Sequence, residues 1–184
     1  IVFILLHAFH YLESKQQQTA HTLNLFLNIL SSISYEKRFI HWLYEYNNAL
    51  IRILDLCCNT TWLSRYLARY PILFEELMES LEASKPINHK TLNKSLNTLM
   101  DQPKTTEELG LNLLRDFLHR NVLKIAMADF SGKVPLMIVS DYLSELADTL
   151  LNKILRLAWH ELSLKHGQPT SDKHANGRPD FIIV

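Results

Sequence analysis

The side chains best suited to bind a metal lie near the start of the chain. His7 and His10 are three residues apart and Glu13 follows one turn later, so all three can share one face of a helix. A metal site needs three or four converging ligands, and no further ligand in the sequence pairs with these. We therefore interpret the group as a coincidence of spacing and predict no metal site.

Two other patterns resemble parts of catalytic motifs. His160-Glu161 begins like a zinc-protease motif, but the second histidine would fall at position 164, which is Leu164. Adjacent Cys57 and Cys58 cannot form an unstrained disulfide within a helix, so we expect reduced thiols. Nothing around Cys57 indicates the base that a nucleophile needs, which favours a small buried hydrophobe. We predict no catalytic residue, metal or cofactor site in this chain.

Four charged residues remain as candidates for an interface. Arg65 and Arg69 lie one helical turn apart and can form a patch for a partner's carboxylates or phosphates, although a solvated helix face is the simpler interpretation. Lys124 and Asp129 lie near the apolar side of a long helical segment, where charges usually need partners. We favour a structural ion pair between subdomains; the alternative is that they face a nucleotide bound by an adjoining domain.

Composition excludes several classes of protein. Of 184 residues, 47% are apolar and 21% charged, which is typical of a soluble globular protein. Lys plus Arg equals Asp plus Glu, at 19 each, so no net field attracts nucleic acid or an anionic membrane. The apolar run at the N-terminus is too short to span a bilayer, and reduced cysteines fit a cytoplasmic protein. The chain has no glycine-rich phosphate loop and no Asp-x-Asp pair, so phosphate-transfer chemistry cannot be assembled from it.

Apolar residues recur at helical spacing along most of the chain, which predicts an all-α fold. Residues 1–83 read as an irregular bundle of short helices, one of them Tyr35–Tyr46 with Ser34 as its N-cap. Residues 84–104 are rich in proline, asparagine and serine, and we interpret them as a linker that contains one weak helix, Lys90–Met100.

Residues 105–184 are predicted to contain two long helices. Thr105 and Glu108 form a capping box that opens the first, and Ser140 caps the second, Asp141–His166. The spacing of apolar residues predicts one buried side on each helix: Leu114, Phe117, Leu118, Val122 and Ile125 on the first, and Leu143, Leu146, Leu150, Ile154, Leu157 and Leu162 on the second. The three tryptophans lie on apolar stripes, which predicts core packing for Trp42, Trp62 and Trp159.

The chain ends on an apolar segment, Phe181–Val184, that reads as a single β-strand. Two longer stretches, Trp62–Met78 (WLSRYLARYPILFEELM) and Leu123–Thr170 (beginning LKIAMADFSGKVPLMIVSDYLSELAD), resemble the middle of the bacterial bifunctional glutamine synthetase adenylyltransferase/adenylyl-removing enzymes. The resemblance covers roughly residues 33–184 and is weakest across the predicted linker. The order, spacing and ending of these segments agree with that family.

The resemblance implies a fold and a function. In that family, a helical region lies between two nucleotidyltransferase domains, one removing AMP from glutamine synthetase and the other attaching it from ATP with Mg²⁺. It implies that this span is the helical scaffold coupling the two domains, and that Phe181–Val184 starts a truncated nucleotidyltransferase domain. Where the family commonly has arginine, this chain has Lys124, so a bidentate contact there would be lost.

The implied partners are glutamine synthetase, a PII-type signal protein and the flanking catalytic domains, with no nucleic acid and no membrane. ATP and Mg²⁺ are implied for the parent enzyme and not for this span. The alternative to this interpretation is a stand-alone helical module for protein–protein interaction.

Overall fold

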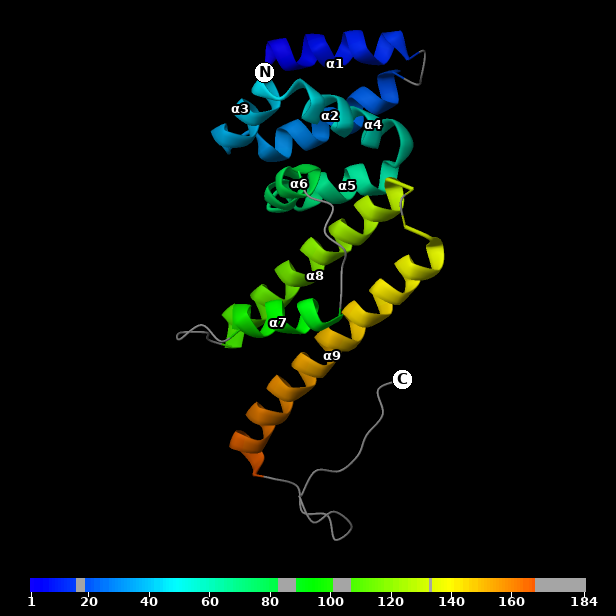
Figure 1. The fold of residues 1–184 in the computed structure, drawn as a ribbon. Helices are drawn as coiled ribbons and strands as arrows, with labels where there is room; N and C mark the ends of the chain where they lie inside the picture. Colours follow the sequence, from blue (N-terminus) through cyan, green and yellow to red (C-terminus); the bar gives the residue numbers. More distant parts are fainter. Residues whose placement is uncertain (16–18, 83–88, 101–106, 133, 168–184) are drawn as a thin grey trace.

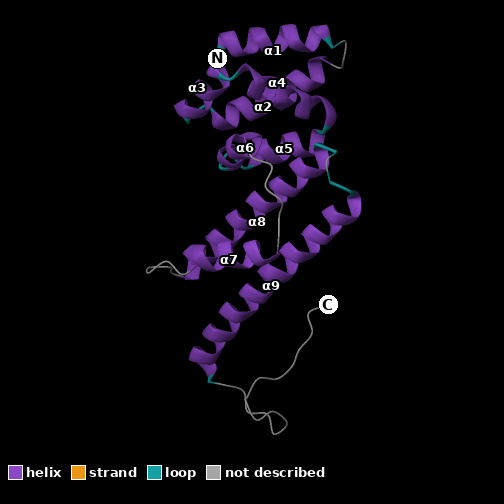
Figure 2. Cartoon of the chain, viewed as in Figure 1, coloured by secondary structure: helices purple, strands orange, loops and turns teal. Residues whose placement is uncertain are grey.

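The computed structural model describes residues 1–15, 19–82, 89–100, 107–132 and 134–167, and all regular secondary structure in these ranges is helical (Figure 2). The helices, in chain order, are α1 (Val2–Ser14), α2 (Thr19–Ile33), α3 (Lys37–Glu45), α4 (Asn47–Asn59), α5 (Thr61–Arg69), α6 (Leu73–Glu82), α7 (His89–Met100), α8 (Glu107–Phe130) and α9 (Leu136–His166). The predicted all-α fold, with short helices followed by two long ones, is confirmed for this part of the chain.

The helices form an elongated stack (Figure 1). Helix α1 lies at one end, α2, α3 and α4 lie below it, and α5 and α6 come next. Helices α8 and α9 then run away from the stack, with α7 packed on both. The short helices α1–α6 therefore form one half of the molecule, and the long helices α8 and α9, with α7, form the other.

The first hydrophobic core lies among α1–α6. Its largest fully buried side chains include Phe26 of α2, Phe39 of α3 and Phe74 of α6, and the rings of Phe39 and Phe74 are 5.3 Å apart. Apolar residues at helical spacing line its inner faces, which explains why six short helices pack together here. One residue of this core, Leu123, comes from α8 and has no exposed surface.

The second hydrophobic core lies among α7, α8 and α9. Helix α7 contributes Leu92, Leu96 and Met100, while α9 contributes Val139, Leu146 and Leu150. The weak helix predicted for Lys90–Met100 is thus present, and it packs on both long helices. The division of the chain into 1–83, 84–104 and 105–184 stays a prediction.

Helix α8 belongs to both cores, and this corrects the prediction of one buried side. Leu114, Phe117 and Ile125 are buried in the second core, whereas Leu123 is buried in the first. Leu118, predicted as buried, is 37% exposed. A helix that packs on two partners in different directions does not follow a single apolar stripe.

Helix α9 begins earlier than the sequence predicts, and fewer of its apolar side chains are buried. It starts at Leu136, directly after Pro135 as its N-cap, so Ser140 lies inside the helix and is not the cap. Proline fixes φ and has no N–H to satisfy, which suits it to a helix start. Leu146 and Leu150 of the predicted stripe are buried, but Leu143, Ile154 and Leu162 are exposed because α7 and α8 cover only one side of α9.

The cap predicted for α3 is also wrong. The helix begins at Lys37 with Glu36 as N-cap, and the hydroxyl of Ser34 instead donates a hydrogen bond of 2.8 Å to the carbonyl of Ser31. Bonding to a carbonyl three residues back extends the end of α2 and competes with capping. At the C-terminal end of α9, Gly167 is the C-cap, with a positive φ of 80°.

Two sequence predictions lie outside the described residues. These are Thr105 of the predicted capping box and the strand Phe181–Val184. Within the described ranges, no helix combines the length and the apolar character needed to cross a membrane.

Candidate functional site

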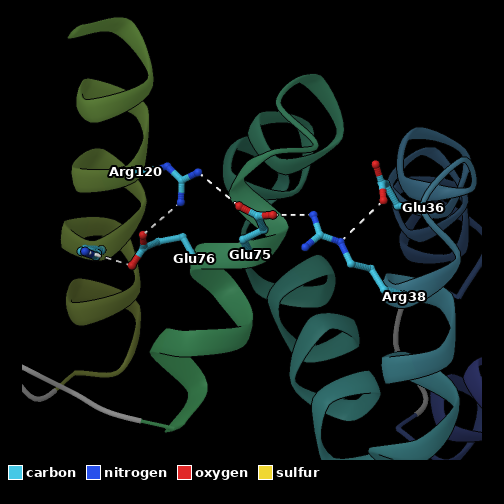
Figure 3. A network of polar contacts seen from close by, with 6 residues as sticks. Glu36, Arg38, Glu75, Glu76 and Arg120 are labelled. Carbon is cyan, nitrogen blue, oxygen red and sulfur yellow. Dashed lines mark hydrogen bonds and ion pairs between the residues drawn. The ribbon is translucent and has the colours of Figure 1, made fainter. Parts of the chain in front are cut away.

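Charged side chains of three helices meet where α3, α6 and α8 come together (Figure 3). Glu76 of α6 is 5% exposed, and its carboxylate contacts Lys124 Nζ at 2.9 Å and Arg120 Nη1 at 3.7 Å, both from α8. Arg120 and Lys124 are four residues apart, so they lie on one face of α8. A nearly buried carboxylate is stable here because two cations compensate its charge.

The neighbouring Glu75 extends this network toward α3. Its carboxylate accepts hydrogen bonds from Arg38 and, at 3.3 Å, from Arg120. The hydrogen bond from Arg38 lowers the pKa of Glu75, and that from Arg120 acts in the same direction against the opposing effect of burial. Arg38 also contacts Glu36 at 3.5 Å. The acidic pair in α6 therefore bridges the half formed by short helices and the half formed by long ones.

An aromatic stack lies where α5 meets α8. The ring of Tyr66 stacks on that of Trp62, with centroids 5.2 Å apart, and shares a hydrogen bond of 2.6 Å with Nδ1 of His119. The ring of Tyr70 stacks on the His119 imidazole at 3.9 Å. Spacing of four residues aligns Trp62 and Tyr66 of α5 with Tyr70, which is the C-cap of that helix, and α8 supplies the histidine.

Burial shifts Tyr66 and His119 of the stack toward their neutral forms. It raises the pKa of Tyr66 to about 12, with Tyr70 adding to the rise. It also lowers the pKa of His119; Asp116 opposes that shift, while Arg115 and Arg69 reinforce it. At neutral pH the contact between α5 and α8 is therefore made by an uncharged phenol and an uncharged imidazole.

The four residues singled out in the sequence do not form one site. Lys124 forms its ion pair with Glu76, while Asp129 is exposed and its backbone carbonyl accepts a hydrogen bond from Gly132. Arg65 and Arg69 are exposed on α5, where the Arg69 guanidinium lies 5.6 Å from the centre of the Tyr70 ring.

One tryptophan contradicts the prediction of core packing. Trp62 is 58% exposed, because it lies on the outer side of α5 while Leu63 and Leu67 face the core. Trp42 and Trp159 are partly buried, and Trp42 packs against the first core.

Cys57 was considered above as a nucleophile and His7 as a metal ligand, and the structure shows what surrounds each of them. Cys57 is buried, and burial raises the pKa of its thiol to about 11, so the reactive thiolate is not formed at neutral pH. His7 contacts Asn47 at 3.3 Å and lies against the ring of Phe3. Within the described ranges, no three His, Cys, Asp or Glu side chains gather closely enough to hold a metal ion.

Sequence reasoning missed Glu76, Arg120 and His119, although signals for them were present. Two adjacent glutamates stand between apolar residues in the sequence LFEELM of α6, and a basic pair follows at a spacing of four in α8. An acidic pair on one helix and a basic pair on one face of another can form ion pairs that hold the two helices together. Only the fold, however, shows which two helices meet.

Comparison with known proteins gives matches over most of the chain. Residues 50–184 match the family model of glutamate-ammonia ligase adenylyltransferase. The bifunctional glutamine synthetase adenylyltransferase/adenylyl-removing enzyme of Pseudomonas putida is 33% identical over 86% of the chain, and that of Pseudomonas aeruginosa gives the same figures. The enzyme of Vibrio parahaemolyticus is 32% identical over 85%. The chain spans only 16% to 17% of the length of these relatives.

Glu76→Gln tests the ion network. The substitution keeps the size of the side chain but removes the charge that Lys124 and Arg120 share, so we expect the free energy of unfolding to fall by about 1–3 kcal/mol. Urea denaturation followed by circular dichroism measures it. Glu13→Gln, on the exposed end of α1, is the matched control and should change stability by less than about 0.5 kcal/mol. Equal effects of the two substitutions would show that the network is not stabilising.

The lowered pKa of His119 predicts that the free energy of unfolding depends on pH. Its pKa is lower in the folded protein than the usual value of about 6.5, so the unfolded chain binds more protons near that pH. The contribution of neutral His119 is complete above about pH 6.5 and is lost as the pH falls through the folded pKa. Unfolding measured between pH 7.5 and pH 5 should show a smaller loss of stability for His119→Gln than for the unchanged chain. Parallel pH profiles for the two proteins would refute this assignment.

Proposed function

The chain belongs to the glutamate-ammonia ligase adenylyltransferase family, and we propose that it is a helical scaffold within an enzyme that attaches AMP to glutamine synthetase and removes it. The observation that carries the proposal is the joint between the two halves of the fold. Helix α8 is buried in both cores, and the acidic pair of α6 binds α8 through Arg120 and Lys124. Such a joint can transmit a displacement because packed cores resist deformation.

Apolar surfaces at the two ends of the elongated fold support the same proposal. At one end α1 exposes Val2, Phe3 and Leu6. Toward the other end, α9 exposes a row of apolar residues at helical spacing along most of its length: Leu143, Leu151, Ile154 and Leu162. Exposed rows of this kind suit contact with further domains. We propose that catalytic domains of the same polypeptide cover them, and that α1–α9 hold these domains at a fixed spacing.

The chemistry of AMP transfer is proposed to lie outside this span. In support, no three His, Cys, Asp or Glu side chains of the described ranges gather closely enough to hold a metal ion. Glutamine synthetase as the protein target, a PII-type signal protein as a regulator and a cytoplasmic location belong to the proposal for the parent enzyme.

Distance measurement between the two ends tests the scaffold. Spin labels are placed at Glu13→Cys in α1 and Arg156→Cys in α9, in a Cys58→Ser background where the remaining Cys57 is buried. Double electron–electron resonance should give one narrow distance distribution, because the packed joint fixes both ends. Adding Glu76→Gln should broaden it. A broad or two-peaked distribution in the labelled chain without Glu76→Gln would contradict a rigid scaffold.

A separate assay addresses catalysis. The purified chain, incubated with ATP, Mg²⁺ and glutamine synthetase, should transfer no AMP to the protein. Transfer by this chain alone would contradict the non-catalytic part of the proposal and leave the rigidity result unaffected.

A further inference from the structure

The outer side of α5 presents an aromatic ring followed by two guanidinium groups. Trp62, Arg65 and Arg69 are spaced by three and four residues, so they project from one side of the helix, and all three are exposed. We call these three residues the Trp62 face. The inner side of α5 is occupied by Leu63, Ser64 and Leu67, which are buried in or beside the first core.

The tryptophan of this face is held in position from beneath. Its ring stacks on Tyr66 with an angle of 19° between the planes, and Tyr66 is itself fixed by its hydrogen bond to His119. Because His119 also stacks on Tyr70, the ring system is anchored to both α5 and α8. A large side chain that is already ordered loses little conformational entropy when a partner covers it.

The arginines of this face differ from those at the α6–α8 joint. Arg38 and Arg120 both contact Glu75, whereas no described carboxylate forms an ion pair with Arg65 or Arg69. Arg69 and the nearby Arg115 both add positive potential at His119, and Asp116 is the one acidic group that acts on that imidazole. The Trp62 face therefore carries an excess of positive charge, although the whole chain has none.

We infer that the Trp62 face binds an acidic segment of a protein partner. The segment places an apolar or aromatic side chain on the indole of Trp62, and carboxylates on the guanidinium groups of Arg65 and Arg69. Guanidinium groups match the planar geometry of carboxylates, and tryptophan, tyrosine and arginine dominate the energetics of protein interfaces. The inference does not depend on the scaffold role, because it rests only on the exposed side of α5 and on the rings that hold Trp62 in place.

Carboxylates fit this face better than nucleic acid does. A nucleic-acid surface typically extends along many phosphates and needs a basic stripe, whereas the Trp62 face has two arginines on a helix of nine residues.

Binding of defined peptides tests the inference. The probes are 12-residue peptides with blocked ends, each with four Asp or Glu residues and one Phe or Leu, and matched peptides in which Asn and Gln replace the acids. Nuclear magnetic resonance of the three tryptophan indole N–H groups follows binding to the full chain, and Trp62→Phe assigns the signal of Trp62. We expect acidic peptides to shift the Trp62 signal and the neutral peptides to leave it unchanged.

Variants separate this face from general attraction of acids to a basic surface. Arg65→Ala with Arg69→Ala should weaken binding of the acidic peptides at least about tenfold, equivalent to 1.4 kcal/mol or more. Arg156→Ala, an exposed arginine on α9, is the matched control and should leave the affinity unchanged. Circular dichroism checks that each variant folds, which is expected because the substituted side chains are exposed.

Three outcomes would overturn the inference. In the first, no acidic peptide shifts the Trp62 signal. In the second, Arg156→Ala weakens binding as much as the double variant does, which indicates non-specific attraction. In the third, a phosphorylated peptide or a short single-stranded DNA binds at least about tenfold more tightly than every acidic peptide, which assigns the face to phosphate.

Discussion

The fold depends on a carboxylate that is almost removed from water. Glu76 is 5% exposed in the middle of the molecule, and a charge in that position is costly unless cations surround it. Arg120 and Lys124 supply those cations from α8, and their spacing of four residues fixes which face of α8 turns toward α6. The adjacent Glu75 adds Arg38 of α3, so one acidic pair sets the relative positions of three helices (Figure 3).

The same joint explains how two cores act as one structure. Leu123 lies next to Lys124 in the sequence and is fully buried among the short helices, while Ile125 faces the second core. Three consecutive residues of α8 thus contact the first core, the ion network and the second core. The Tyr66–His119 contact adds a further link one turn earlier along α8. A rigid connection of this kind is what the proposed scaffold requires, and it places the exposed Trp62 face beside the joint.

The helical spacing of apolar residues was enough to predict the all-α fold. The spacing of apolar residues predicted two long helices in the last third of the chain, and α8 and α9 confirm them. It failed where burial depends on neighbours. Trp62 and Leu118 have the spacing of core residues but lie on sides that no helix covers, and the outer half of α9 shows the same pattern. The role of Lys124 was partly foreseen, whereas its partner Glu76 was not, because sequence alone does not say that α6 meets α8.

Hydrogen exchange in the variant Leu123→Ala tests directly whether the two cores form one cooperative structure. Removing this side chain leaves a cavity in the first core and should lower the free energy of unfolding by about 2–5 kcal/mol. If α8 couples the cores, protection of the buried amides should fall by a similar free energy in α2 and in α9, while Leu118→Ala, on the exposed side of the same helix, should change little. Loss of protection confined to α1–α6, with α9 unchanged, would contradict the account.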